Sequence, residues 1–123
     1  MNPEANKTVV RRYLEMWNTG NMGLANEVLA STWVDHSHPE ATGPESVEQA
    51  VLQIRAAFPD FRITIESMVG EDDLVALRGI VRRETVSRVM WFVRLADGKM
   101  LEMWTGSEVS VEAVTVPWQV SQL

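Results

Sequence analysis

The sequence contains no cysteine and only two histidines among its 123 residues. The missing thiols exclude disulfide scaffolds, cysteine-ligated zinc, iron–sulfur clusters and thiol nucleophiles, and two histidines exclude a three-histidine metal centre. No apolar run approaches the ~20 residues of a membrane span, and the first residues lack the basic and apolar regions of a secretory signal. We therefore expect a cytoplasmic protein that does not contact a membrane.

Positively charged residues are also few: the sequence has 11 Lys and Arg and 17 Asp and Glu, which gives a formal net charge of −6. Nucleic acids bind clustered Lys and Arg, so they are not expected partners. The acidic balance is interpreted as a contribution to solubility. The length fits a single domain over residues 1–123, and five tryptophans in so short a chain are the unusual feature of its composition.

The first half of the sequence has the period of amphipathic helices. Apolar residues recur at spacings of three and four over residues 9–17, 24–29 and 47–58, which predicts three helices. Thr42 and Glu45 have the spacing of a capping box at the start of the third helix. A brief apolar run before that helix leads into a loop.

The second half changes to the period of two that strands show. Alternating or apolar segments bounded by turn residues predict four strands, at residues 61–66, 74–83, 86–95 and 100–111. Asp97-Gly98 is a hairpin signal between the last two. Helices followed by consecutive hairpins indicate an α+β domain in which helices pack on one face of an antiparallel sheet.

Short motifs follow one another in a specific order along most of the chain. They are Trp17-Asn18-Thr19-Gly20-Asn21, Asp35-His36, Gly43-Pro44-Glu45-Ser46-Val47, Phe58-Pro59-Asp60-Phe61, the run from Gly70 to Arg78, and the run from Arg94 to Trp104. This succession, from about residue 5 to about residue 108, resembles the SnoaL-like polyketide cyclase family of the nuclear-transport-factor-2-like superfamily.

The resemblance implies a cystatin-like, cone-shaped α+β barrel in which a curved antiparallel sheet wraps over N-terminal helices and encloses an apolar cavity. Members of the family with known activity close rings on aromatic polyketides by intramolecular aldol condensation. Others in the superfamily are isomerases, dehydratases, epoxide hydrolases or proteins without enzymatic activity, so the fold alone does not determine the function.

The family pattern places an acid four residues after the tryptophan of the closing strand, and here that acid is Glu108, after Trp104. A carboxylate beside an indole in an apolar cone is partly desolvated, which raises its pKa and suits acid–base catalysis. The alternative is an exposed glutamate near the end of a strand.

His36 matches the Asp-His pair that the family carries after a short strand. At the mouth of a cavity it would polarise a carbonyl or relay a proton, with Asp35 as the residue that orients it. A structural alternative is that Asp35 and His36 hydrogen-bond their loop to the adjacent helix. Two histidines and a carboxylate in one loop, with His38 added, are only a weak metal signal.

Bulky apolar side chains are the candidates for substrate binding, with core packing as the alternative. They are Trp17, Trp33, Phe58, Trp91, Trp104 and Met103. Strand alternation requires that Trp91 and Phe92 face opposite sides of the sheet, and that Met103 and Trp104 do the same. Large apolar groups on both faces therefore predict a second covering surface, and a homodimer through the outer face of the sheet would supply it.

Two departures from the family pattern remove polar groups. Met103 stands where many members have a histidine, and Trp91 stands where many have a polar residue. The favoured hypothesis is a small enzyme without cofactor that acts on a hydrophobic, carbonyl-bearing metabolite as an aldol cyclase or isomerase. The alternative is a non-catalytic module of the same fold that binds a hydrophobic small molecule or serves dimerisation.

Overall fold

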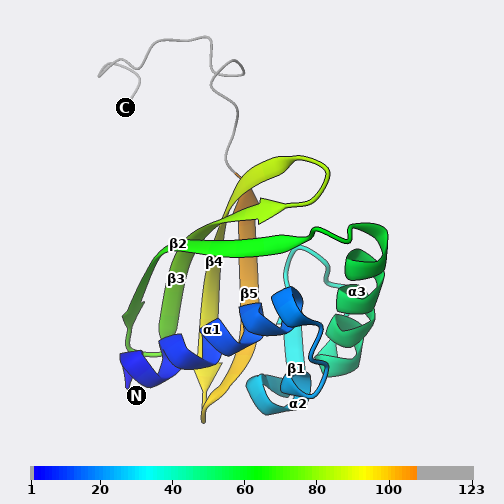
Figure 1. Ribbon diagram of the computed structural model, residues 1–123. Coiled ribbons are helices and arrows are strands. Elements are labelled where there is room, and N and C mark those ends of the chain that lie inside the picture. The colour runs from blue at the N-terminus through cyan, green and yellow to red at the C-terminus, as the bar shows by residue number, and fades with distance from the viewer. Residues whose placement is uncertain (1, 108–123) are drawn as a thin grey trace, which may run out of the picture.

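The computed structural model describes residues 2–107 of the chain. Its elements in order are α1 (Pro3–Thr19), α2 (Leu24–Val28), β1 (Leu29–Asp35), α3 (Gly43–Ala57), β2 (Arg62–Glu71), β3 (Leu74–Arg82), β4 (Val86–Ala96) and β5 (Lys99–Ser107). Figure 1 shows α1 crossing one face of a curved sheet, with α3 beside β1. This is the α+β architecture that the sequence predicts. Within the described residues, no helix is long and apolar enough to cross a membrane.

The sheet has the strand order β1-β5-β4-β3-β2. Strands β2 to β5 form the antiparallel meander that the period of two predicts. The expectation of a wholly antiparallel sheet needs one correction, because β1 pairs with β5 in the parallel direction, with Asp35 opposite Met103. Helix α3 and three strands separate β1 from β5 in the chain, so no local turn signal reveals this pairing.

Helix α1 is held at both ends by local chemistry. The Asn2 side chain accepts hydrogen bonds from the backbone of Glu4 and Ala5, and Gly20 ends the helix in the left-handed region at φ 78°. The Asn18 side chain then bonds both backbone groups of Ile63, at 2.8 Å to the carbonyl oxygen and 2.7 Å to the amide nitrogen. The end of α1 is thereby fixed on the edge strand β2.

Helix α3 begins without the capping box that the sequence predicts. Thr42 occupies the N-cap position, but its side chain makes no capping hydrogen bond. The backbone of Thr42 forms an isolated antiparallel β-bridge with Val34. At the other end, Arg55 Nη1 donates to the carbonyl oxygens of Trp17 and Asn18, at 3.1 and 2.7 Å. These bonds tie α3 to the end of α1, where the cavity described below begins.

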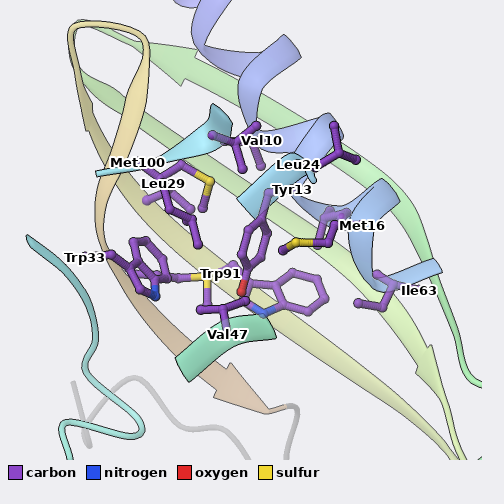
Figure 2. Close-up of a cluster of buried hydrophobic side chains, with 14 of the residues drawn as sticks. Val10, Tyr13, Met16, Leu24, Leu29, Trp33, Val47, Ile63, Trp91 and Met100 are labelled. Carbon is purple, nitrogen blue, oxygen red and sulfur yellow. The ribbon is translucent and has the colours of Figure 1, made fainter. Parts of the chain in front are cut away.

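The core lies between the helices and one face of the sheet (Figure 2). Strand alternation is confirmed, because Trp91 and Met103 are buried in this core while Phe92 and Trp104 are exposed on the opposite face. Gly79 allows close packing beside Trp91, since a Cβ there would lie 2.6 Å from the Thr64 carbonyl oxygen and 3.1 Å from the Trp91 ring. The sequence pattern predicts that the two faces differ but not which residues face inward.

Candidate functional site

A cavity of about 550 Å³ opens between α1, α3 and β1, a volume in the range of small-molecule pockets. The residues that line it come from the helices, from β1 and the loop after it, and from the end of β3. They are Tyr13, Trp17, Trp33, Asp35, His38, Glu40, Ala41, Ser46, Val47, Gln49, Ala50, Gln53, Ile54, Phe61, Val81 and Arg83.

Aromatic rings form the inner wall of this cavity. The Tyr13 and Trp33 ring centroids lie 5.8 Å apart, and those of Tyr13 and Trp17 lie 6.4 Å apart with planes inclined by 66°. Phe61 extends the series at 6.0 Å from Trp17. Tilted and edge-to-face pairs of this kind are the favoured geometries of aromatic side chains. The inner wall of the cavity is therefore aromatic and apolar.

Asp35 brings a carboxylate to the same cavity. Trp33 and Asp35 are two residues apart on β1 and share one face of the strand, so both line the cavity. The Asp35 Oδ1 atom accepts a hydrogen bond from the Ser37 amide at 2.9 Å, which fixes the carboxylate at the end of the strand. The cavity thus contains both a carboxylate that can accept a proton, that of Asp35, and an aromatic inner wall.

Tyr13 brings a hydroxyl to the same cavity. Burial raises the pKa of the Tyr13 hydroxyl far above its ordinary value, the Trp17 side chain acts against this shift, and the negative charge of Asp35 adds to it. The hydroxyl therefore stays protonated at physiological pH and is a hydrogen-bond donor. A protonated donor and a carboxylate in one apolar cavity are the groups that proton transfer at a carbonyl compound requires.

The rim of the cavity is polar. His38 and Glu40 come from the loop after β1, with 3.8 Å between His38 Nδ1 and Glu40 Oε1, and Gln49 and Gln53 come from α3. Arg83 lies above the Phe58 ring, 5.8 Å from its centroid. The charged groups other than Asp35 thus gather where the cavity meets solvent.

His36 lies on the other face of the sheet and does not line the cavity, which corrects the expectation that it stands at the cavity mouth. Its Nε2 atom lies 2.8 Å from Glu102 Oε1, and its ring stacks on Trp104 with centroids 4.7 Å apart and planes 9° apart. Adjacent residues at the end of a strand face opposite sides, so Asp35 points inward and His36 outward. Asp35 therefore does not orient His36.

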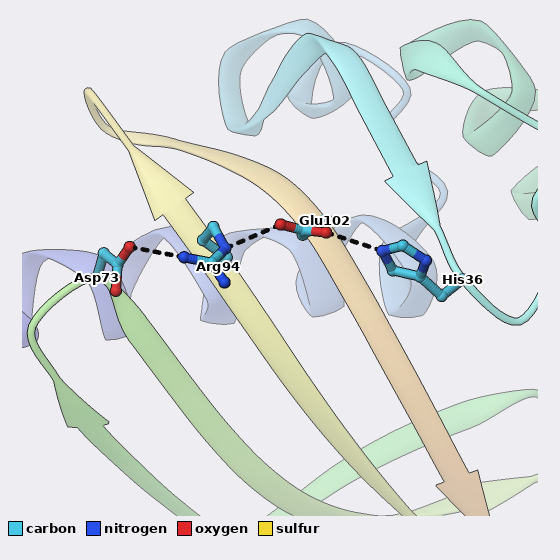
Figure 3. A network of polar contacts seen from close by, with 4 residues as sticks. All are labelled: His36, Asp73, Arg94 and Glu102. Carbon is cyan, nitrogen blue, oxygen red and sulfur yellow. Dashed lines mark hydrogen bonds and ion pairs between the residues drawn. The ribbon is translucent and has the colours of Figure 1, made fainter.

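The contacts of His36 belong to a polar network on the outer face (Figure 3). Glu102 also accepts a hydrogen bond from Arg94 Nε at 2.8 Å, and Arg94 Nη1 lies 3.2 Å from Asp73 Oδ2. The hydrogen bond with His36 lowers the pKa of Glu102, burial acts against this shift, and Arg94 supports it. The network holds β5 to β4 and to the loop after β1.

The other predicted site residues divide between the two faces and the edge of the core. Trp17 and Trp33 line the cavity, whereas Trp91 and Met103 are buried in the core beside it. Phe58 packs against the core at the end of α3, and Trp104 lies on the outer face, away from the cavity. Glu108 lies outside the described residues.

Sequence reasoning did not assign several cavity residues to the site, and two of these residues, Tyr13 and His38, carry groups with chemistry. Tyr13 has the helical spacing of its apolar neighbours, which predicts a buried position and does not indicate that its hydroxyl lines a cavity; the signal that could have found it is that it is the one tyrosine of the sequence. His38 entered only as a weak metal ligand, and it lies at the rim. Among residues 2–107, no group of three or more His, Cys, Asp or Glu has the arrangement of a metal site.

Comparisons with known proteins find one family model, that of the SnoaL-like polyketide cyclase, which matches residues 7–90. Structural similarity extends to TsrD from Streptomyces laurentii, at 15% identity over 88% of this chain and 91% of that one, with a TM-score of 0.78. A SnoaL-like polyketide cyclase from Agrobacterium tumefaciens is 15% identical over 88% and 93%, with a TM-score of 0.73. A loop-truncation variant of IdmH is 26% identical over 84% and 92%, with a TM-score of 0.72. No curated protein matches the sequence.

Proposed function

Because the chain belongs to the SnoaL-like polyketide cyclase family, we propose that it is an enzyme that needs no cofactor and acts on a hydrophobic, carbonyl-bearing metabolite. The reaction class is an intramolecular aldol cyclisation or an isomerisation, both of which begin with removal of a proton next to a carbonyl. The observation that carries this proposal is that the Asp35 carboxylate and the protonated Tyr13 hydroxyl line one aromatic cavity.

In the proposed reaction, Asp35 takes the proton from the carbon next to the substrate carbonyl. The electron pair of that C–H bond then forms the enolate, and the Tyr13 hydroxyl donates a hydrogen bond to the enolate oxygen. In a cyclase the enolate carbon attacks a second carbonyl of the same molecule, and the new alkoxide receives the proton back. Trp17 and Trp33 support this assignment because they bring aromatic, apolar rings to the lining of the cavity.

Glu108 is the second candidate for the acid–base role, from its position four residues after Trp104. It and Asp35 can be separated by paired variants, Asp35→Asn and Glu108→Gln, each of which removes one carboxylate with little change of shape. His36 has no place in this mechanism, since its ring contacts Glu102 and Trp104 on the outer face.

The test follows proton exchange in a simple aromatic ketone, 2-acetylnaphthalene. Wild-type protein in D₂O should accelerate deuterium exchange at the acetyl methyl group, measured by loss of its proton NMR signal. Asp35→Asn should lower the protein-dependent rate by about 10²–10⁴, the usual contribution of a general base. Asp60→Asn makes the same chemical change at an exposed residue that does not line the cavity, and its rate should match that of wild type.

Each other outcome has a definite meaning. A full rate in Asp35→Asn together with a lost rate in Glu108→Gln would assign the base to Glu108. An exchange rate in wild type equal to that of buffer would contradict the enzymatic proposal. Tryptophan fluorescence that changes with ketone concentration but without exchange would instead support the non-catalytic binding module, which the apolar residues Met103 and Trp91 favour.

We also propose that a second copy of the chain covers the outer face of the sheet. Within the described residues the helices pack on the opposite face, and the outer face leaves large apolar side chains in solvent. They include Met90 at 58% exposure, Phe92 at 43% and Trp104 at 36%. Aromatic groups and methionine are typical of the centre of protein interfaces, which supports a homodimer through this face.

A further inference from the structure

Trp33 has a hydrogen-bond donor without an acceptor. Its side chain is 0% exposed, and its indole Nε1 has no hydrogen-bond partner among the described residues. The Tyr13 ring lies 5.8 Å away between centroids with its plane tilted by 46°, and no hydrogen bond joins it to the indole. Buried polar groups in native proteins are almost always paired, so a tryptophan in this state calls for an explanation.

The position of Trp33 suggests what completes the hydrogen bond. The residue belongs to the inner wall of the 550 Å³ cavity, and Figure 2 shows its ring among the buried side chains around Tyr13. A phenylalanine would fill a purely apolar core position without a buried N–H group. A ligand in the cavity is the partner that can bring an acceptor to this wall.

The charges around the wall restrict the chemistry of that acceptor. Asp35 lies two residues along the same strand face, and its charge opposes a second anion near Trp33. Arg83 and His38, which could balance an anion, are exposed residues of the rim. An unpaired anion at the buried wall would be costly, whereas a neutral oxygen needs only the one donor.

We propose that the Trp33 indole N–H is a specificity-determining donor that binds a neutral carbonyl or quinone oxygen of the ligand. This inference rests on the proposed function for the location of the ligand, and it adds that the cavity selects a neutral oxygen acceptor at its buried wall. A flat hydrocarbon of the same shape leaves the N–H group unpaired and therefore binds less tightly.

The first test compares two ligands of matched shape, 2-acetylnaphthalene and 2-isopropenylnaphthalene, in which a C=CH₂ group replaces the C=O group. Wild-type protein should bind the ketone about tenfold more tightly, the effect of one hydrogen bond to an otherwise unpaired buried donor. Trp33→Phe should bind the ketone and the alkene with about equal affinity. Trp91→Phe is the matched control, because it shortens another buried indole that does not line the cavity, and it should keep the preference.

A second test, by NMR, uses the wild-type protein and therefore does not require Trp33→Phe to fold. Labelling the tryptophans with ¹⁵N gives an indole N–H signal for each of the five residues. Addition of the ketone should move one of these proton signals downfield as its hydrogen bond forms, and the alkene should not. Trp33→Phe, where it folds, assigns the signal by its disappearance.

The outcomes separate this inference from the proposed function. Equal binding of ketone and alkene to wild type, or a preference retained by Trp33→Phe, would overturn the role of Trp33 and leave the cavity and the Asp35 chemistry standing. Binding of neither ligand would overturn both proposals. A tenfold preference without proton exchange would support the donor role and contradict the enzymatic one.

Discussion

Asn18 provides a direct test of how the cavity wall is held against the sheet. Strand β2 is an edge strand, and the Ile63 backbone groups that turn away from β3 have the Asn18 side chain as their partner. The side-chain amide of Asn18 thus forms the two hydrogen bonds that a residue of a neighbouring strand would form with Ile63. Ile63 is buried, at 7% exposure. Asn18→Ala would leave both backbone groups without this partner.

The expected loss follows from the two hydrogen bonds. At about 0.5–1.5 kcal/mol each, Asn18→Ala should lower the free energy of unfolding by roughly 1–3 kcal/mol. Asn18→Asp keeps an acceptor for the Ile63 N–H group but places a charged oxygen against the Ile63 carbonyl. Because two acceptors then face one another, this variant should be destabilised at least as much as Asn18→Ala.

The assay is equilibrium unfolding in urea, followed by circular dichroism and by tryptophan fluorescence. Asn26→Ala is a matched control, since Asn26 is exposed and, within residues 2–107, its side chain forms no hydrogen bond; its backbone oxygen accepts one from Lys99 Nζ. The control should remain within about 0.5 kcal/mol of wild type. A loss in Asn18→Ala no larger than that of the control would refute the reasoning.

Two further predictions concern the outer face of the sheet. The pKa of Glu102 is lowered in the folded chain, so the stability that this carboxylate contributes is present above its ordinary pKa and is lost as pH falls through the depressed value. The urea midpoint of Glu102→Gln should therefore fall less than that of wild type below about pH 4.5, and parallel curves would contradict this. For the homodimer, sedimentation velocity should show a dimer for wild type and for Leu52→Lys, an exposed position on α3, and a monomer for Phe92→Lys. A monomeric wild type would rule out the dimer.

Much of the fold could be predicted because its signals are local. The helical period over residues 47–58 and the Asp97-Gly98 hairpin signal depend on neighbours in the chain, and both elements occur. The parallel pairing of β1 with β5 depends on residues about 70 positions apart, such as Asp35 and Met103, for which the sequence offers no local cue. The same holds for Thr42, whose side chain forms no capping hydrogen bond and whose backbone forms a bridge with Val34.

The candidate site was harder to predict because it depends on which way each side chain faces. Alternation separates Trp91 from Phe92, but only the packing of α1 decides that Trp91 is the inner one. The sequence predicts His36 in a loop at the cavity mouth. In the structure the strand alternation continues through His36, because its amide donates a hydrogen bond to the Met103 carbonyl oxygen. Tyr13 shows the opposite difficulty, since its spacing predicts burial and says nothing of its hydroxyl.

The neighbouring positions Asp35 and His36 place an acid inside the molecule and an imidazole outside it, one peptide bond apart. An insertion or deletion that shifts the register of the strand therefore changes which of the two side chains faces inward when it moves the chain by an odd number of residues, and not when it moves the chain by an even number. The pairing of β1 is irregular between Leu29 and Val34 and regular from Val34 to Asp35. A shift of one residue in the regular part would exchange the two side chains and remove the interior carboxylate, while a shift of two residues would restore the original order. As long as Asp35 is needed, single-residue insertions and deletions in this strand are therefore confined to the irregular segment between Leu29 and Val34, where they need not change the pairing of Asp35 with Met103.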